Sequence, residues 1–134
     1  MLNITTADRV AIYEVIALHG HLIDDGEWDR LGEVFASDIV FDITDYGYGT
    51  LRGLDAMLEL VRGVHDDKNQ ALGHHVTNTV VTGQDGDTVS ARSKGLGVAP
   101  DGGAGTAIYE DTLRREPQGW RISYRKAIAR RTES

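Results

Sequence analysis

Two adjacent histidines at the start of a strand-like segment have the clearest chemical potential in this sequence. His74 and His75 precede residues 76–82, which are rich in the β-branched side chains typical of a strand. Because successive side chains of a strand point to opposite faces, His74 and Asn78 are predicted to share one face, with His75 on the other. Histidine is the side chain best suited to proton transfer near neutral pH. We therefore predict a buried proton-transfer site around His74, where Asn78 either donates to a substrate oxygen or satisfies neighbouring backbone.

The first third of the chain supplies two further candidates. Apolar residues recur at helical spacing from Ile12 to Ile23, and His19 lies in the middle of this apolar face. A polar ring there needs a hydrogen-bond partner or a cavity, so His19 is either a bonded core residue or a pocket residue. Asp24 lies off the apolar face near the end of the segment, and periodicity alone places its carboxylate toward solvent.

Later segments contribute residues that could contact a substrate. Tyr109 and Asp111 share one face of a predicted strand, and Tyr48 lies where the mouth of a pocket is expected. Each is either a packing or rim residue or a chemical one. Arg125 interrupts the last predicted strand, where it forms either a surface ion pair or a pocket cation that holds an acidic group.

The histidine pairs do not predict a metal site. In His19-Gly20-His21 the imidazoles are two residues apart on a helix, and His74 and His75 are neighbours on a strand, so both pairs diverge. The chain has no cysteine and therefore no thiolate ligand or cysteine nucleophile. It also lacks a phosphate-binding glycine loop, a nucleophile elbow and a dinucleotide fingerprint. We expect neither a metal nor a cofactor.

The elements that would position these residues fall into a helical part and a strand part. The first part is predicted to hold a helix from Thr5 or Thr6 to about Gly26, a short helix over 27–36, a strand over 39–43, a turn or ragged strand over 46–50 and a helix over 54–65. The second part is predicted to hold antiparallel strands over 74–82, 88–98, 106–115 and 120–130.

This order of elements predicts an α+β fold in one domain spanning residues 1–134. Asp85-Gly86 is a strong hairpin signal between the first two strands of the second part. Helices followed by a long meander favour one strongly bent sheet with helices packed on one face. Such a sheet can curl into a half-open cone whose interior is a pocket.

Composition narrows the functional classes. The formal net charge of −7 argues against general nucleic-acid binding, which needs a basic face. No apolar run reaches membrane-spanning length, and residues 1–6 lack the charged and apolar regions of a signal peptide. The absence of cysteine fits a reducing compartment. We therefore expect a cytoplasmic protein that acts on a small molecule.

Segments in order along nearly the whole chain resemble the SnoaL-like group of the NTF2-like superfamily. They are Leu22–Asp29 with its Asp-Asp-Gly-Glu-Trp-Asp sequence, Phe35–Phe41, Gly53–Ala56, His74–Asn78, and Tyr109–Asp111 followed by Gly119–Ile122 and Arg125. The resemblance implies the cone-shaped NTF2-like fold.

The resemblance also implies a catalytic Asp–His dyad. In the dehydratase and dehydrochlorinase branches of the superfamily, an aspartate near the end of the first helix pairs with the histidine that opens the histidine strand. The matching residues here are Asp24 and His74, because His74 stands four residues before Asn78. Those enzymes often have Tyr or Lys five residues before the aspartate, in contact with substrate or leaving group, whereas this chain has His19. The implied function is a cofactor-independent lyase or isomerase acting on a small, largely apolar, cyclic substrate.

Two other functions fit the same resemblance. One is a non-catalytic ligand binder or partner subunit, like the small subunit of ring-hydroxylating dioxygenases. It predicts a missing or solvent-exposed Asp24 contact and co-purification with a larger iron-containing subunit. The other is a polyketide cyclase, which uses the same acid–base groups. The resemblance further suggests a homodimer or homotrimer built on the outer face of the sheet.

Overall fold

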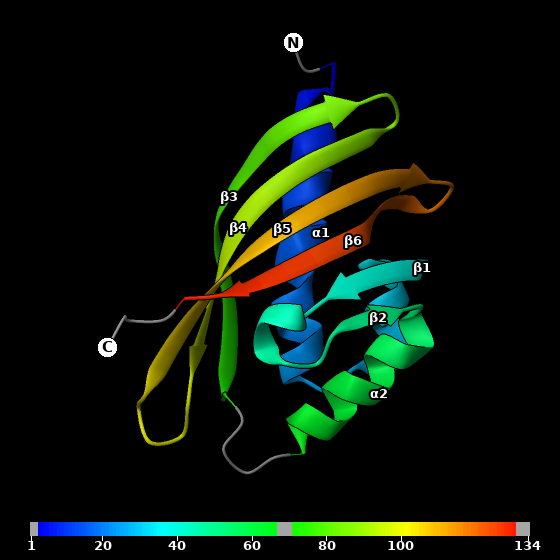
Figure 1. The fold of residues 1–134 in the computed structure, drawn as a ribbon. Coiled ribbons are helices and arrows are strands. Elements are labelled where there is room, and N and C mark those ends of the chain that lie inside the picture. The colour runs from blue at the N-terminus through cyan, green and yellow to red at the C-terminus, as the bar shows by residue number, and fades with distance from the viewer. Residues whose placement is uncertain (1–2, 67–70, 131–134) are drawn as a thin grey trace.

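Helices occupy the first half of the chain and long strands the second, as Figure 1 shows for the computed structural model, which describes residues 3–66 and 71–130. The elements are α1 (Thr6–Asp24), the 3-10 helix η1 (Trp28–Glu33), β1 (Phe35–Asp42), the 3-10 helix η2 (Thr44–Tyr46), β2 (Thr50–Arg52), α2 (Leu54–His65), β3 (Gly73–Asp85), β4 (Thr88–Val98), β5 (Ala104–Glu116) and β6 (Gly119–Ala129). The predicted α+β class is confirmed.

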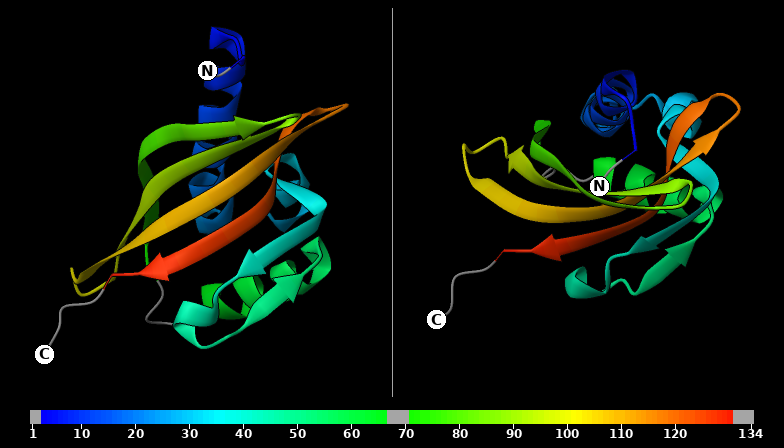
Figure 2. Two further views of the ribbon diagram at one scale, coloured as in Figure 1. Left: turned by 45° about the horizontal axis from the view of Figure 1, so that its top comes forward. Right: turned by 90° about the horizontal axis from the view of Figure 1, so that it is seen from above.

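The six strands form one sheet in the order β2-β1-β6-β5-β4-β3. β3 to β6 form the predicted antiparallel meander, and β1 joins β6 in parallel. The sheet is strongly curved, with α1 lying over its concave face and α2 beside β1 and β2 (Figures 1 and 2). This curvature makes the half-open cone that the sequence predicts.

The first helix starts and packs as its sequence predicts. Thr5 caps it: its hydroxyl oxygen accepts from the backbone N–H of Asp8, and the Asp8 carboxylate accepts from the backbone N–H of Thr5, both at 3.0 Å. Along the inner face, Ile12, Ile16 and Leu22 are fully buried. This face joins the core that α1 shares with the concave side of the sheet.

The predicted helix over residues 27–36 is wrong in its second half. The chain makes only the 3-10 helix η1, and β1 begins at Phe35. Phe35 pairs with Ile122 of β6, and the Ile122 backbone N–H donates to the Val34 carbonyl at 2.8 Å. Parallel pairing with a strand almost 90 residues away overrides the local helical pattern, and β1 therefore starts four residues before the predicted strand.

Candidate active site

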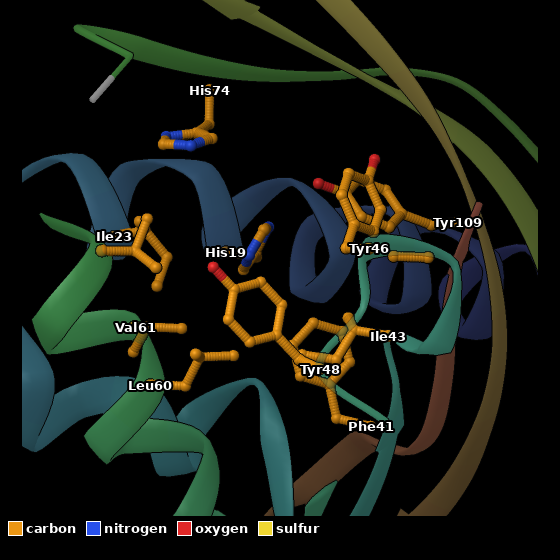
Figure 3. A pocket seen from close by; sticks show the side chains of 12 residues that line it. His19, Ile23, Phe41, Ile43, Tyr46, Tyr48, Leu60, Val61, His74 and Tyr109 are labelled. Atoms are coloured by element: carbon orange, nitrogen blue, oxygen red, sulfur yellow. The ribbon is translucent and has the colours of Figure 1, made fainter. Parts of the chain in front are cut away.

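An apolar cavity opens between the concave face of the sheet, α1 and α2. Its volume is about 360 Å³. Figure 3 shows its lining, in which the rings of His74, His19 and Tyr48 turn toward the interior. The rest of the polar lining is Tyr46 and Tyr109. The apolar lining consists of Ile23, Phe41, Ile43, Leu60, Val61, Val64 and Ala127.

Asp24 and His74 meet at the wall of this cavity. The Asp24 Oδ1 atom lies 2.6 Å from His74 Nδ1, and the two side chains are 22% and 24% exposed. The backbone N–H of His74 also donates to both carboxylate oxygens, at 3.1 and 3.0 Å. A carboxylate only accepts hydrogen bonds, so the Nδ1 atom carries the shared hydrogen and the tautomer is set. The contact predicted between these residues is therefore present.

A glycine makes this contact possible. Gly20 lies one helical turn before Asp24, where α1 crosses the first residues of β3. A Cβ atom at Gly20 would lie 2.4 Å from the carbonyl oxygen of His74, closer than real Cβ contacts come. The absence of a side chain thus lets the helix backbone touch the strand backbone, which brings the carboxylate within reach of the imidazole.

His19 is a buried, neutral side chain in the cavity wall. It is 8% exposed, and its ring packs edge-on against Phe35 and Tyr109. Burial, followed by the charge of Arg125 and the proximity of His74, holds the pKa of His19 well below its ordinary value. Its Nδ1 atom has no hydrogen-bond partner among the described residues. The ring therefore brings an unsatisfied polar atom into an apolar site, which agrees with a pocket role and not with a bonded core residue.

Arg125 and Asp111 form a buried ion pair behind Tyr109. The Arg125 Nε and Nη2 atoms donate to the two Asp111 carboxylate oxygens at 2.7 and 2.9 Å, and both side chains are 1% exposed. The guanidinium lies 4.2 Å from the centre of the Tyr109 ring. Burial opposes the charged form, but Asp111 outweighs it and raises the pKa of Arg125. Burial likewise raises the pKa of Tyr109, which keeps its hydroxyl neutral.

Both interpretations of Arg125 are thereby corrected. The ion pair is buried instead of lying at the surface, and Arg125 is not among the residues that line the cavity of Figure 3. Thr112 pairs with Tyr124 and Leu113 with Ile122, so Ser123 is an extra residue in β6. Such a bulge changes which face the following side chains occupy. Arg125 consequently enters the interior, where Asp111 holds it.

The predicted placement of Asn78 beside His74 is wrong. The pairing of β3 with β4 shifts between Thr77 and Val80, and Asn78 has a φ of 57°. This bulge turns the exposed Asn78 side chain away from the cavity, where its Oδ1 atom accepts from the Thr77 hydroxyl at 3.0 Å. Beyond the bulge Val80 is exposed and Val81 is buried. The face that begins with His74 therefore continues at Val81.

His19, Tyr48 and Tyr109 line the cavity together with His74, as the sequence predicts. Tyr48 is 59% exposed and lies at the rim. Sequence reasoning missed Tyr46 and the contribution of α2. The sequence shows the apolar side of α2 as a helical periodicity. Val61 becomes a cavity residue because the fold places α2 across the cavity from α1.

The described residues form neither a metal-binding cluster nor a membrane-spanning helix. Within residues 3–66 and 71–130, no three His, Cys, Asp or Glu side chains are grouped so that they could hold a metal ion. None of the helices described by the structure has the length and apolarity needed to cross a membrane.

Comparison with known structures identifies the class of fold. A crystal structure of an NTF2-like protein with a cystatin-like fold from Novosphingobium aromaticivorans matches with a TM-score of 0.78 and 27% identity, over 96% of this chain and 85% of that chain. The structure of LinA matches with a TM-score of 0.70 and 22% identity, over 93% and 85% of the two chains. The chain has the NTF2-like fold.

The family is identified by sequence. The model of the SnoaL-like domain matches residues 5–126, so this chain belongs to the SnoaL-like family. A protein from Novosphingobium aromaticivorans, provisionally named an aromatic ring hydroxylase, is 30% identical with a TM-score of 0.81, over 98% of this chain and 95% of that chain. No curated protein matches the sequence.

Proposed function

We propose that this protein is a cofactor-independent acid–base enzyme of the lyase or isomerase type, such as a dehydratase. The observation that carries the proposal is the 2.6 Å contact between Asp24 Oδ1 and His74 Nδ1 at the wall of an apolar cavity. Asp24 orients the imidazole and stabilises its protonated form, so His74 acts as a general base through its Nε2 atom. The same acid–base groups would also serve the polyketide cyclase that the resemblance allows.

The proposed reaction begins with loss of a proton beside an activating group of the substrate. The C–H bond breaks, its proton passes to His74 Nε2, and its electron pair forms a carbon–carbon double bond. In an elimination, the bond to the leaving group on the adjacent carbon breaks with its electron pair. In an isomerisation, the π pair of the activating carbonyl moves to its oxygen to give an enolate; His74 then returns the proton to a different carbon as the carbonyl re-forms. The neutral His19 ring hydrogen-bonds an oxygen of the substrate or leaving group.

The cavity lining supports a small, neutral and largely apolar substrate. Its polar residues are two histidines and three tyrosines, and among the described residues neither a lysine nor an arginine lines it. The Arg125 guanidinium, which lies against the Tyr109 ring, is paired with the Asp111 carboxylate. A carboxylate or phosphate would lack a compensating charge there, whereas a cyclic molecule with one or two oxygen functions would find both apolar walls and hydrogen-bonding groups.

A partner-subunit function is the second candidate, and the name of the 30% identical Novosphingobium protein favours it. Such a function does not need the carboxylate of Asp24 to be aligned with His74. It predicts that the protein co-purifies from its native cells with a larger iron-containing subunit, and that substitution of Asp24 leaves this association intact. The homodimer or homotrimer implied by the family resemblance remains a prediction.

Exposed residues of the same type provide matched controls for the dyad. His74→Gln and Asp24→Asn are each compared with the same substitution at the exposed residues His21 and Asp25, which line neither this cavity nor the neighbouring cleft that His74 also borders. Turnover is measured on a panel of hydroxylated and halogenated cyclic substrates. We expect the dyad variants to lose about 10²–10⁴ in kcat/KM, and the controls to stay within about twofold of wild type. Full activity of folded His74→Gln protein would exclude the proposed base.

A further inference from the structure

We propose that the substrate site continues past His74 into a second cleft, and that this cleft binds a second flat ring of an elongated, uncharged substrate. This inference rests on the proposed function for the identity of the reacting end of the molecule. It adds a binding site for the non-reacting end of the substrate, which we expect to be a flat ring.

The two spaces meet at the proposed catalytic base. The second cleft has a volume of about 570 Å³. Its walls share four residues with the cavity of Figure 3, namely Tyr46, Val64, His74 and Tyr109. His74 therefore borders both spaces. A substrate whose reacting carbon lies beside His74 can extend into both of them.

Glycine and alanine form much of the floor of the second cleft. Residues paired across neighbouring strands project from the same face of a sheet. Gly97 pairs with His74 on one side and with Gly105 on the other, so all three share the concave face. In the next row, Val76 pairs with Gly95, Gly95 with Ala107, and Ala107 with Ala129. All of these residues line the cleft, and apart from His74 and Val76 at the β3 edge none has a side chain larger than a methyl group.

Packing within the protein explains only part of this pattern. A Cβ atom at Gly95 would lie 2.6 Å from the Tyr109 ring, so glycine is needed there to seat the tyrosine. A Cβ atom at Gly97 would come within 3.3 Å of Ala71. A Cβ atom at Gly105 would meet nothing within 4 Å, and Gly105 lies outside the left-handed region. A glycine inside a strand weakens it and often marks close approach of a ligand.

The shape and charge of the cleft define its occupant. A pleated floor built mostly of glycine and alanine leaves room for a flat ring that lies against the backbone, and Tyr46 and Tyr109 line both this cleft and the first cavity. Within residues 3–66 and 71–130, Arg130 is the one lysine or arginine that lines the cleft, and it is exposed. Because the cleft shares four wall residues with the reaction cavity, the occupant we assign to it is the second ring of the same molecule.

Filling the open position at Gly105 tests this proposal. Phenol serves as the one-ring probe and 9H-fluoren-2-ol as the flat, elongated probe, and both are titrated into the full chain by following its ¹H–¹⁵N spectrum. Wild type is expected to bind the fluorenol at least tenfold more tightly than phenol. Gly105→Leu should remove at least tenfold of the fluorenol affinity, which corresponds to about 1.4 kcal/mol, while phenol affinity stays within about twofold.

Gly83→Leu is the matched control. It places the same side chain in open space on the same sheet, away from both cavities, and should change neither affinity. If Gly105→Leu does not fold, the smaller Gly105→Ala variant decides, with an expected loss of at least threefold for the fluorenol alone. The proposal would be overturned if wild type bound the two probes with equal affinity, or if the fluorenol affinity were unchanged by the substitution at Gly105. Binding of these probes requires no turnover. If no substrate of the panel were turned over, the proposed function would be contradicted, but the binding comparison would still test the second cleft.

Discussion

Substitution of Gly20 by alanine should separate Asp24 from His74 without substituting either residue of the proposed dyad. The new Cβ atom would lie 2.4 Å from the His74 carbonyl oxygen, whereas ordinary contacts begin at 3.4 Å. The helix and strand must therefore move apart by roughly 1 Å. The Oδ1–Nδ1 separation is 2.6 Å in the native protein. A displacement of this size lengthens it beyond hydrogen-bond distance, and a 1 Å misplacement costs about 10²-fold in rate.

The same substitution elsewhere in the chain separates this effect from helix propensity. Gly63 lies inside α2 and is exposed, and a Cβ atom there would meet nothing within 4 Å. Gly63→Ala should therefore stabilise the protein by about 0.5–1 kcal/mol and leave turnover unchanged. Gly20→Ala should lower kcat/KM by about 10²-fold, with a crystal structure that shows the longer contact. Thermal unfolding of both variants checks that they fold. A folded Gly20→Ala enzyme with native turnover would refute this account of how α1 positions the carboxylate.

Two further predictions concern the buried charges behind the cavity. Asp111→Ala should lower the free energy of unfolding, measured by urea denaturation, by about 3–5 kcal/mol, because it leaves the Arg125 guanidinium buried without its partner. The double substitution of Asp111→Leu with Arg125→Met should lower it by less than that single change. His19 has a lowered pKa in the folded protein, so the unfolded chain binds more protons below about pH 6.5, and stability is full above that pH and falls as the solution is acidified. His19 contributes at most about 1.4 kcal/mol per pH unit to the slope of unfolding free energy against pH. His19→Leu should therefore reduce this slope between pH 7 and 5 by up to that amount. An unchanged slope would contradict a neutral, buried His19.

Local signals in the sequence were sufficient for the regular elements. The strand predicted over residues 88–98 matches β4 residue for residue, and the helix predicted over 54–65 matches α2. Both are bounded by turn or cap residues and follow a single period along their length. The Asp24–His74 contact was predictable only through the family resemblance, because helical periodicity alone points Asp24 toward water.

The errors arise where one residue changes the phase of a strand. Asn78 interrupts a β-branched run, and asparagine is the non-glycine residue that most readily adopts a positive φ, so the bulge in β3 had a weak local signal. The bulge at Ser123 had none, because it depends on how β6 aligns with β5. It nevertheless decides that Arg125 is buried. Such long-range alignment is also what converts the predicted end of a helix into the start of β1.

The protonation of the His74 ring tests the central claim most directly. ¹⁵N NMR of labelled protein, recorded at a pH where the His74 ring is neutral, reports which imidazole nitrogen carries the hydrogen. In that neutral ring the contact with Asp24 predicts a hydrogen on Nδ1 and none on Nε2, and a loss of this preference in Asp24→Asn but not in Asp25→Asn. A neutral His74 ring protonated at Nε2, or a tautomer that does not respond to Asp24→Asn, would contradict the assignment of His74 as a base oriented by Asp24.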